Sequence, residues 1–276
     1  MFLRVLRNEF KRTFNNSRIL FCYFLLICMF IGFSLWYSHD IPLSNTYAEL
    51  NSAYIVFTSL FSHPAYSQIS FVLSIIILMI NGDSLYIDNV SDIFDYSVTR
   101  MSKNKYVLYK GLATSLCAFI GIFVGTLFCL LFCFVKFPMI TPTNPEFAPI
   151  FARHLFMTNP ILYILYYLII LGLFGSFVLT IANIVSIYNK KHLFITMVIP
   201  FVLILLYSII AIYISCDFQG AIKTILLRYN PISMISEYIY CMDIHILTPL
   251  LYWLGLNLFS WIIYCFLYRK KLSKVL

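Results

Sequence analysis

The chain has 276 residues, of which 62% are hydrophobic and only 11% are charged, less than half of the roughly 25% found in soluble domains. This composition excludes a globular protein dissolved in water and predicts an integral membrane protein with a single transmembrane domain over residues 1–276. The formal net charge of +8 could serve nucleic-acid binding, but basic residues that flank and orient membrane spans explain it better. We therefore expect no nucleic-acid partner.

Residues 1–18 are predicted to supply an amphipathic helix at the N-terminus. Leucine and phenylalanine side chains recur there at helical spacing, at Leu3, Leu6, Phe10 and Phe14. Basic side chains occupy the remaining surface, at Arg4, Arg7, Lys11 and Arg12. Such a helix is expected to lie flat in the cytoplasmic interface, held by burial of its apolar side and by attraction to anionic membrane lipid.

Six apolar runs are long enough to cross a bilayer, because about 20 apolar residues in a helix span its hydrocarbon core. They lie at about 19–37, 65–82, 107–135, 161–187, 193–214 and 246–268. The second run is the weakest, since Ser67, Gln68 and Ser70 dilute its start. The predicted fold class is an all-α integral membrane protein with six transmembrane helices.

The distribution of lysine and arginine predicts the orientation of these spans. With both termini in the cytoplasm, 15 of the 19 basic residues fall in cytoplasmic segments or, for Lys110, near the cytoplasmic start of a span, as the positive-inside rule requires. The gaps at 38–64, 136–160 and 215–246 then lie outside, and residues 83–106 lie inside. Within the last outer gap, the semi-apolar stretch AIKTILLRYNPISMISEYIY could lie along the membrane or dip into it.

The spans lack the residues that most coupled transporters and enzymes use. All eleven carboxylates and all five histidines fall in gaps, in termini or at span edges. We therefore expect no ionisable group buried among the six helices, and no proton- or sodium-coupled mechanism of the usual kind. HExxH, GxSxG and Walker A motifs are absent, which predicts no catalytic residues, no metal site and no cofactor bound by this chain.

Two pairs of small side chains leave alternatives open. Cys216 and Cys241 fall in the same predicted outer loop, where they either form a disulfide or remain free thiols. Gly121 and Gly125 form a GxxxG motif in the third predicted span. Such a motif lets helices approach closely, either within one chain or at a dimer face.

Residues 83–106 are the most informative polar stretch. Asp88, Asp92 and Asp95 recur at steps of three or four on a helix that also carries an apolar stripe, and Arg100 begins its basic end. The segment is either a solvated connector or a helix whose acidic face docks onto a cytoplasmic partner. Its length and its position between the second and third spans favour docking.

Taken together, these features resemble the permease subunits of ABC exporters of the second type. The shared features are the basic start LRNEFKRTFNNSRIL, six spans with both ends inside, the charged helix that ends in TRMSKNKYVLYKGL, and the late outer segment RYNPISMISEY. The resemblance implies that the N-terminal helix and the loop helix contact separate ABC ATPase subunits. Asp88, Asp92, Asp95 and Arg100 become candidate docking residues.

The resemblance also implies a pore built with a second permease copy or a paralogue, with ATP and Mg bound by the ATPase partner. It implies a multi-pass protein of the bacterial cytoplasmic membrane. Because the span walls carry no predicted charge, we expect an apolar or amphipathic substrate, such as an antimicrobial peptide, a lipid-like molecule or a drug. The alternative is a six-span anchoring or assembly protein that recruits a cytoplasmic partner and transports nothing.

Overall fold

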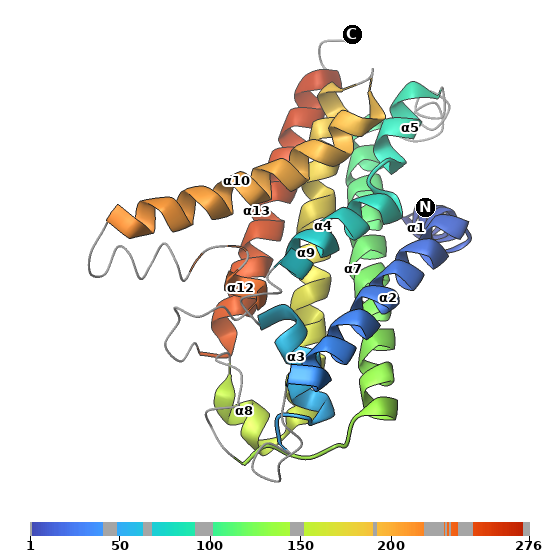
Figure 1. Ribbon diagram of the computed structural model, residues 1–276. Coiled ribbons are helices and arrows are strands. Elements are labelled where there is room, and N and C mark those ends of the chain that lie inside the picture. Colours follow the sequence, from blue (N-terminus) through green and yellow to red (C-terminus); the bar gives the residue numbers. More distant parts are fainter. Residues whose placement is uncertain are drawn as a thin grey trace.

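The computed structural model describes residues 2–40, 49–62, 68–91, 102–143, 152–189, 192–217, 229, 231, 233–236 and 245–272. Its helices are α1 (Phe2–Phe14), α2 (Ser17–Asp40), α3 (Ala53–Ser62), α4 (Gln68–Asn81), α5 (Ser84–Val90), α7 (Lys103–Lys136), α8 (Arg153–Thr158), α9 (Pro160–Tyr188), α10 (Leu193–Asp217), α12 (Ser233–Ser236) and α13 (Leu247–Leu272). Figure 1 shows α7, α9 and α13 running alongside one another, with α5 and the end of α13 at one end of the bundle and α8 at the other.

Six helical stretches are long and apolar enough to cross a membrane, so the chain is a multi-pass membrane protein. Five of the predicted spans are confirmed as single helices, α2, α7, α9, α10 and α13, with ends that agree to within four residues. The agreement follows from composition: an uninterrupted apolar run can bury its backbone polar groups in hydrocarbon only by forming a helix.

The second span is more complex than the sequence predicts. Helix α4 has 14 residues, which is about 21 Å at 1.5 Å per residue and shorter than a hydrocarbon core of about 30 Å. The apolar stretch that is long enough to cross runs over Val72–Val90, through the turn after α4 and into α5. The second candidate span is therefore a helix broken by a turn, with α5 at its end.

Helix α3 lies within residues 38–64, which the sequence predicts to be an outer gap between spans. Its side chains from Ala53 to Phe57 are buried, and the helix packs against α2, α7 and α9. At its start, the backbone N–H of Ala53 donates to the Pro138 carbonyl at 2.9 Å, and Ser52 Oγ donates to the Ile140 carbonyl at 2.5 Å. These bonds hold the start of α3 beside the end of α7.

Helix α9 is the centre of the bundle, because it contacts α4, α7, α10 and α13. Small residues allow α7 to approach it closely. A Cβ added at Gly175 would lie 3.0 Å from Ile122 of α7, and one added at Gly172 would lie 2.8 Å from the Phe119 ring. Close contact of this kind replaces the hydrophobic effect as the source of helix association in lipid.

The short helix α12, Ser233–Ser236, lies within the last predicted outer gap, 215–246. Met234 and Ile235 are completely buried. Trp253 of α13 donates its indole N–H to the Met234 carbonyl at 3.3 Å, and the hydroxyl of Tyr167 on α9 donates to the Ile235 carbonyl. Residues 233–236 therefore dip into the bundle rather than lie along its surface.

Helix α10 leans away from the axis of α9 and α13, and its far end projects from the bundle (Figure 1). Large apolar side chains along it are exposed, including Leu203, Tyr207 and Ile210. Lipid chains can cover such a surface in a membrane, where it carries no penalty of exposure to water. Cys216 lies in the last turn of α10 rather than in a loop, and Cys241 lies outside the described residues, so their pairing stays a prediction.

The GxxxG glycines face other helices of the same chain. Tyr23 of α2 donates its hydroxyl to the Gly121 carbonyl at 3.0 Å, and its ring would lie 2.9 Å from a Cβ at Gly125. A Cβ at Gly121 would lie 3.7 Å from Ile80 of α4. Both glycines are buried, so this structure places them in intrachain packing.

Gly111→Ala is expected to destabilise the contact between α7 and α13. An added Cβ would lie 2.5 Å from the ring of Tyr264, which is fully buried and donates its hydroxyl to the Val107 carbonyl at 3.3 Å. Overpacking of this kind costs about 1–3 kcal/mol, so the thermal unfolding midpoint in detergent should fall. Gly255→Ala on α13 is the control, since nothing lies within 4 Å of its added Cβ. Equal midpoints for the two variants would contradict the described contact.

Candidate functional site

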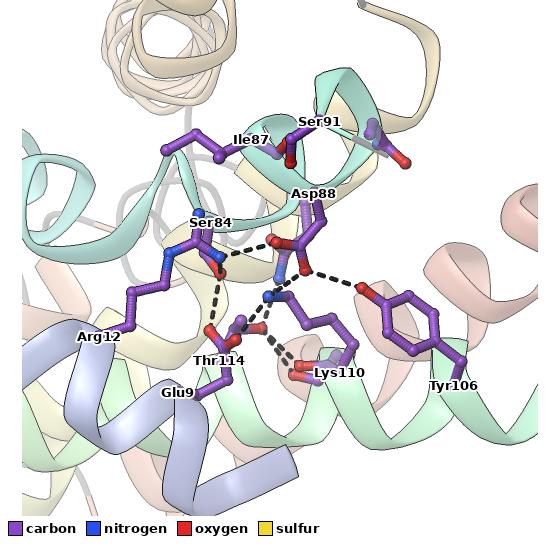
Figure 2. Close-up of polar contacts among 12 residues, drawn as sticks. Glu9, Arg12, Ser84, Ile87, Asp88, Ser91, Tyr106, Lys110 and Thr114 are labelled. Atoms are coloured by element: carbon purple, nitrogen blue, oxygen red, sulfur yellow. Dashed lines mark hydrogen bonds and ion pairs between the residues drawn. The ribbon is translucent and has the colours of Figure 1, made fainter. Parts of the chain in front are cut away.

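Six polar side chains from three helices meet inside the protein (Figure 2). We call this cluster the junction; its members are Glu9 and Arg12 of α1, Ser84 and Asp88 of α5, and Tyr106 and Lys110 of α7. All are buried except Arg12, whose side chain is 28% exposed. Opposite charges thus bring together Arg12 with Asp88 and Glu9 with Lys110, pairs that lie more than 70 positions apart in the sequence.

Lys110 lies at the centre of the junction. Its Nζ atom is 2.6 Å from Glu9 Oε1 and 2.5 Å from Asp88 Oδ2, and the residue is only 2% exposed. A buried ammonium group is costly unless carboxylates and hydrogen bonds compensate its lost hydration. The two carboxylates, one from α1 and one from α5, are what allow Lys110 to be buried.

The remaining carboxylate positions are also satisfied. Asp88 Oδ1 accepts from Arg12 Nη1 at 2.8 Å, and Oδ2 accepts from the Tyr106 hydroxyl at 2.7 Å as well as from Lys110. Glu9 Oε2 accepts from Ser84 Oγ at 2.7 Å. Two acids and two bases therefore balance, and each of the four carboxylate oxygens accepts at least one hydrogen bond.

Arg12 keeps its charge in this setting. Burial by itself would lower the pKa of its guanidinium, but the charge and hydrogen bond of Asp88, with smaller contributions from Glu9 and Asp83, raise that pKa above its ordinary value. The Arg12–Asp88 contact is therefore an ion pair, and it joins α1 to α5.

Helix α5 has only seven residues, yet it is tied to helices beyond the junction. Asn89 Nδ2 donates to the Ser186 carbonyl of α9 at 3.2 Å, and the Tyr268 hydroxyl of α13 donates to Asn89 Oδ1 at 3.4 Å. Asp83, just before α5, pairs with Arg18 of α2. Five helices are thus attached to one short element.

A glycine turn sets the position of α5. A Cβ added at Gly82 would lie 2.5 Å from the backbone oxygen of Leu78, so this tight turn from α4 into α5 has no room for a side chain. After the turn, Ser84 and Asp88 are four residues apart and share one face of α5. That face meets α1 and α7.

Further hydrogen bonds connect Lys110 to α9 through Thr114. The Thr114 hydroxyl lies 3.0 Å from the Lys110 carbonyl and accepts from Asn183 Nδ2 of α9 at 2.8 Å. Thr114 and Asn183 are both buried. The junction is therefore connected to α9 through two routes, this one and Asn89.

The structure corrects two expectations from the sequence. The expectation that no ionisable group is buried among the helices is wrong, because Lys110 lies inside the predicted span 107–135 and is buried with its partners. Asp88 was expected on an exposed acidic face, but it is only 4% exposed and faces Arg12 and Lys110. Its charge is used within the chain and is not available at the surface.

The other predicted site residues divide into two groups. Arg4, Arg7 and Lys11 are exposed on α1. Asp92, Asp95 and Arg100 lie outside the described residues, so their docking role stays a prediction.

Sequence reasoning missed four members of the junction: Glu9, Ser84, Tyr106 and Lys110. Two of these four residues, Glu9 and Lys110, carry a signal in the sequence. Glu9 is the only acid in the basic N-terminal helix, and Lys110 is a charge within an apolar run.

Comparison with known proteins gives no relative: no family model, curated protein or solved structure matches the chain. Within the described ranges, no three His, Cys, Asp or Glu side chains gather as metal ligands. The junction itself holds two carboxylates that are already neutralised by Arg12 and Lys110. The junction therefore joins α1, α5 and α7 to one another through paired charges.

Proposed function

We propose that the chain is the permease subunit of an ATP-driven exporter of the bacterial cytoplasmic membrane, and that separate ATPase subunits supply the energy. In this proposal α1, α5 and the end of α13 face the cytoplasm, as the distribution of basic residues predicts. The substrate is apolar or amphipathic, and a second copy or a paralogue completes the pore.

One observation carries this proposal: α5 is bound by a part-buried ion pair to α1, by a buried ion pair to α7, and by hydrogen bonds to α9 and α13. The segment that follows α5 is the predicted docking loop. A displacement of that loop by an ATPase would reach α5 directly and pass from it to three long helices, because the buried contacts resist separation. Closely packed elements of this kind move as units rather than deform continuously.

The structure changes the role that we assign to Asp88. Its buried pairing makes it a positioning residue that holds α5 in place, and the docking contacts are expected from Asp92, Asp95 and Arg100 beyond it. Glu9 and Arg12 give α1 a similar attachment, so an ATPase that touches α1 would act on the same junction.

Reversing the charge of both Asp92 and Asp95 to lysine is expected to reduce recovery of the ATPase at least tenfold when the tagged chain is purified from its native membrane. Like charges would then face the basic partner surface that the proposal requires. Asp92→Asn with Asp95→Asn is the graded control and should lose less. Membrane insertion, checked by extraction, should be unchanged. Equal ATPase recovery from all three proteins would contradict the docking role.

The function itself is tested by ATP hydrolysis in liposomes that contain the purified complex. Amphipathic peptides added to the liposomes are expected to raise hydrolysis severalfold if the chain is an exporter permease. An anchoring protein could bind an ATPase, but it would not connect substrate binding to hydrolysis. A rate of ATP hydrolysis that does not change with any apolar or amphipathic compound tested would favour the anchoring protein.

A further inference from the structure

Helix α1 presents three different faces. One face lies against α7 and carries Glu9 and Thr13, which are buried. A second face carries Arg4, Arg7 and Lys11, which are spaced three and four residues apart and are all exposed. We call these three residues the basic stripe.

The third face is apolar and lies next to the basic stripe. It consists of exposed Leu3, half-buried Leu6 and Phe10, and Phe14, which also packs against the core of the bundle, and we call it the apolar flank. Leu3 is 74% exposed, and the rings of Phe10 and Phe14 stack with their centroids 4.8 Å apart. Arg4, Arg7 and Lys11 each follow directly after a residue of the flank, so the two faces run side by side along the helix.

The chain's own described carboxylates do not compensate the basic stripe. Glu9, Asp83 and Asp88 are all buried, and each is paired with a base: Lys110, Arg18, or Arg12 and Lys110. Folding has turned these three acids inward and left the bases of the stripe outside. The stripe is therefore more strongly positive than the sequence of α1 suggests, since its only acid is used elsewhere.

The location of α1 indicates what covers these two faces. Helix α1 ends at Phe14, and α2, a candidate membrane span, begins at Ser17. Two residues separate them, so α1 lies at the level where the first span meets the membrane surface. A soluble acidic protein could neutralise the stripe but would leave Leu3 in water, whereas a lipid surface offers acyl chains to the flank and phosphates to the stripe.

We propose that the basic stripe and apolar flank of α1 form a binding surface for anionic phospholipids, and that lipid bound there strengthens the junction. The second part follows from connectivity, because α1 carries Glu9 and Arg12. Lipid that holds α1 in place holds the partners of Lys110 and Asp88 in place as well. The inference depends on the membrane location of the chain and not on transport.

The test uses the full chain in nanodiscs of phosphatidylcholine with or without about one third phosphatidylglycerol. In wild-type protein, phosphatidylglycerol should raise the thermal midpoint and slow amide exchange in α5. Each basic residue near an anionic surface contributes about fivefold to affinity. The triple variant Arg4→Gln, Arg7→Gln, Lys11→Gln should therefore bind phosphatidylglycerol roughly 100-fold more weakly. It should lose most of the rise in thermal midpoint and most of the slowing of amide exchange in α5. Leu3→Ser should remove a smaller part.

The matched control neutralises three exposed bases elsewhere, with Lys105→Gln, Lys136→Gln and Arg269→Gln. It carries the same change in net charge and should keep the response to phosphatidylglycerol. Equal loss in both triple variants would show that only net charge matters, and would overturn the proposal. A full response in the stripe variant would overturn it too. So would the same stabilisation by inorganic phosphate in phosphatidylcholine discs, because a membrane surface would then not be required.

Discussion

Lys110→Met is expected to destabilise the protein by about 3–5 kcal/mol, the cost of removing one partner from a buried ion pair. The substitution leaves Glu9 and Asp88 buried with Arg12 as the only remaining base of the junction. The cavity change is small, since methionine is close to lysine in length. The loss of stability should therefore come mainly from the uncompensated charge. It is measured as a lower unfolding midpoint in detergent.

A second substitution separates charge from packing. Adding Glu9→Gln to Lys110→Met restores the balance of charge, with Arg12 opposite Asp88, and is expected to recover a large part of the loss. The coupling energy between contacting buried groups is typically about 0.5–3 kcal/mol. Lys105→Met, an exposed site on the same helix, is the control and should unfold like wild type. If the double variant is no better than Lys110→Met, the Glu9–Lys110 pair is not what stabilises this region.

The long helices of the fold could be predicted because each depends on local composition. A run such as 161–187 has no alternative in hydrocarbon to forming a helix, and α9 extends over it with one further residue at each end. Helices α3 and α12 could not be predicted in the same way. They have ten and four residues, and both contact Tyr167, which lies far away in the sequence from Phe57 of α3 and from Ile235 of α12.

The junction shows a different limit. The position of Lys110 within an apolar run is visible in the sequence, and a buried base requires a carboxylate. Which carboxylate it meets is not visible, because Glu9 is 101 residues away. The helical spacing places Asp88 on one face with Asp92 and Asp95, yet the structure buries Asp88. Periodicity identifies a face of a helix, but it does not tell whether that face meets water or another helix.

Asp88→Asn is expected to release α5 from α1 and α7 while leaving the long helices in place. Asparagine keeps the size of the side chain but loses the charge that Arg12 and Lys110 bind. Hydrogen bonds to charged groups contribute about 1.5–3 kcal/mol, so amide exchange at Ile87 and Ser91, whose N–H groups bond within the α5 turn, should become roughly 10- to 150-fold faster. Amides of α9 should be unaffected. Unchanged exchange in α5 would mean that the junction does not hold it.

Two comparisons make this result specific, and one connects it to function. Asp83→Asn breaks a pair whose arginine is half exposed, and such pairs contribute little, so its effect on α5 should be much smaller. Adding Arg12→Gln to Asp88→Asn restores the charge balance and should recover part of the protection. In the reconstituted complex, the Asp88→Asn variant should still bind the ATPase through Asp92 and Asp95 but should lose stimulation of hydrolysis by substrate. Loss of binding and stimulation together would place Asp88 in docking after all, whereas loss of stimulation alone is the signature of a broken mechanical link.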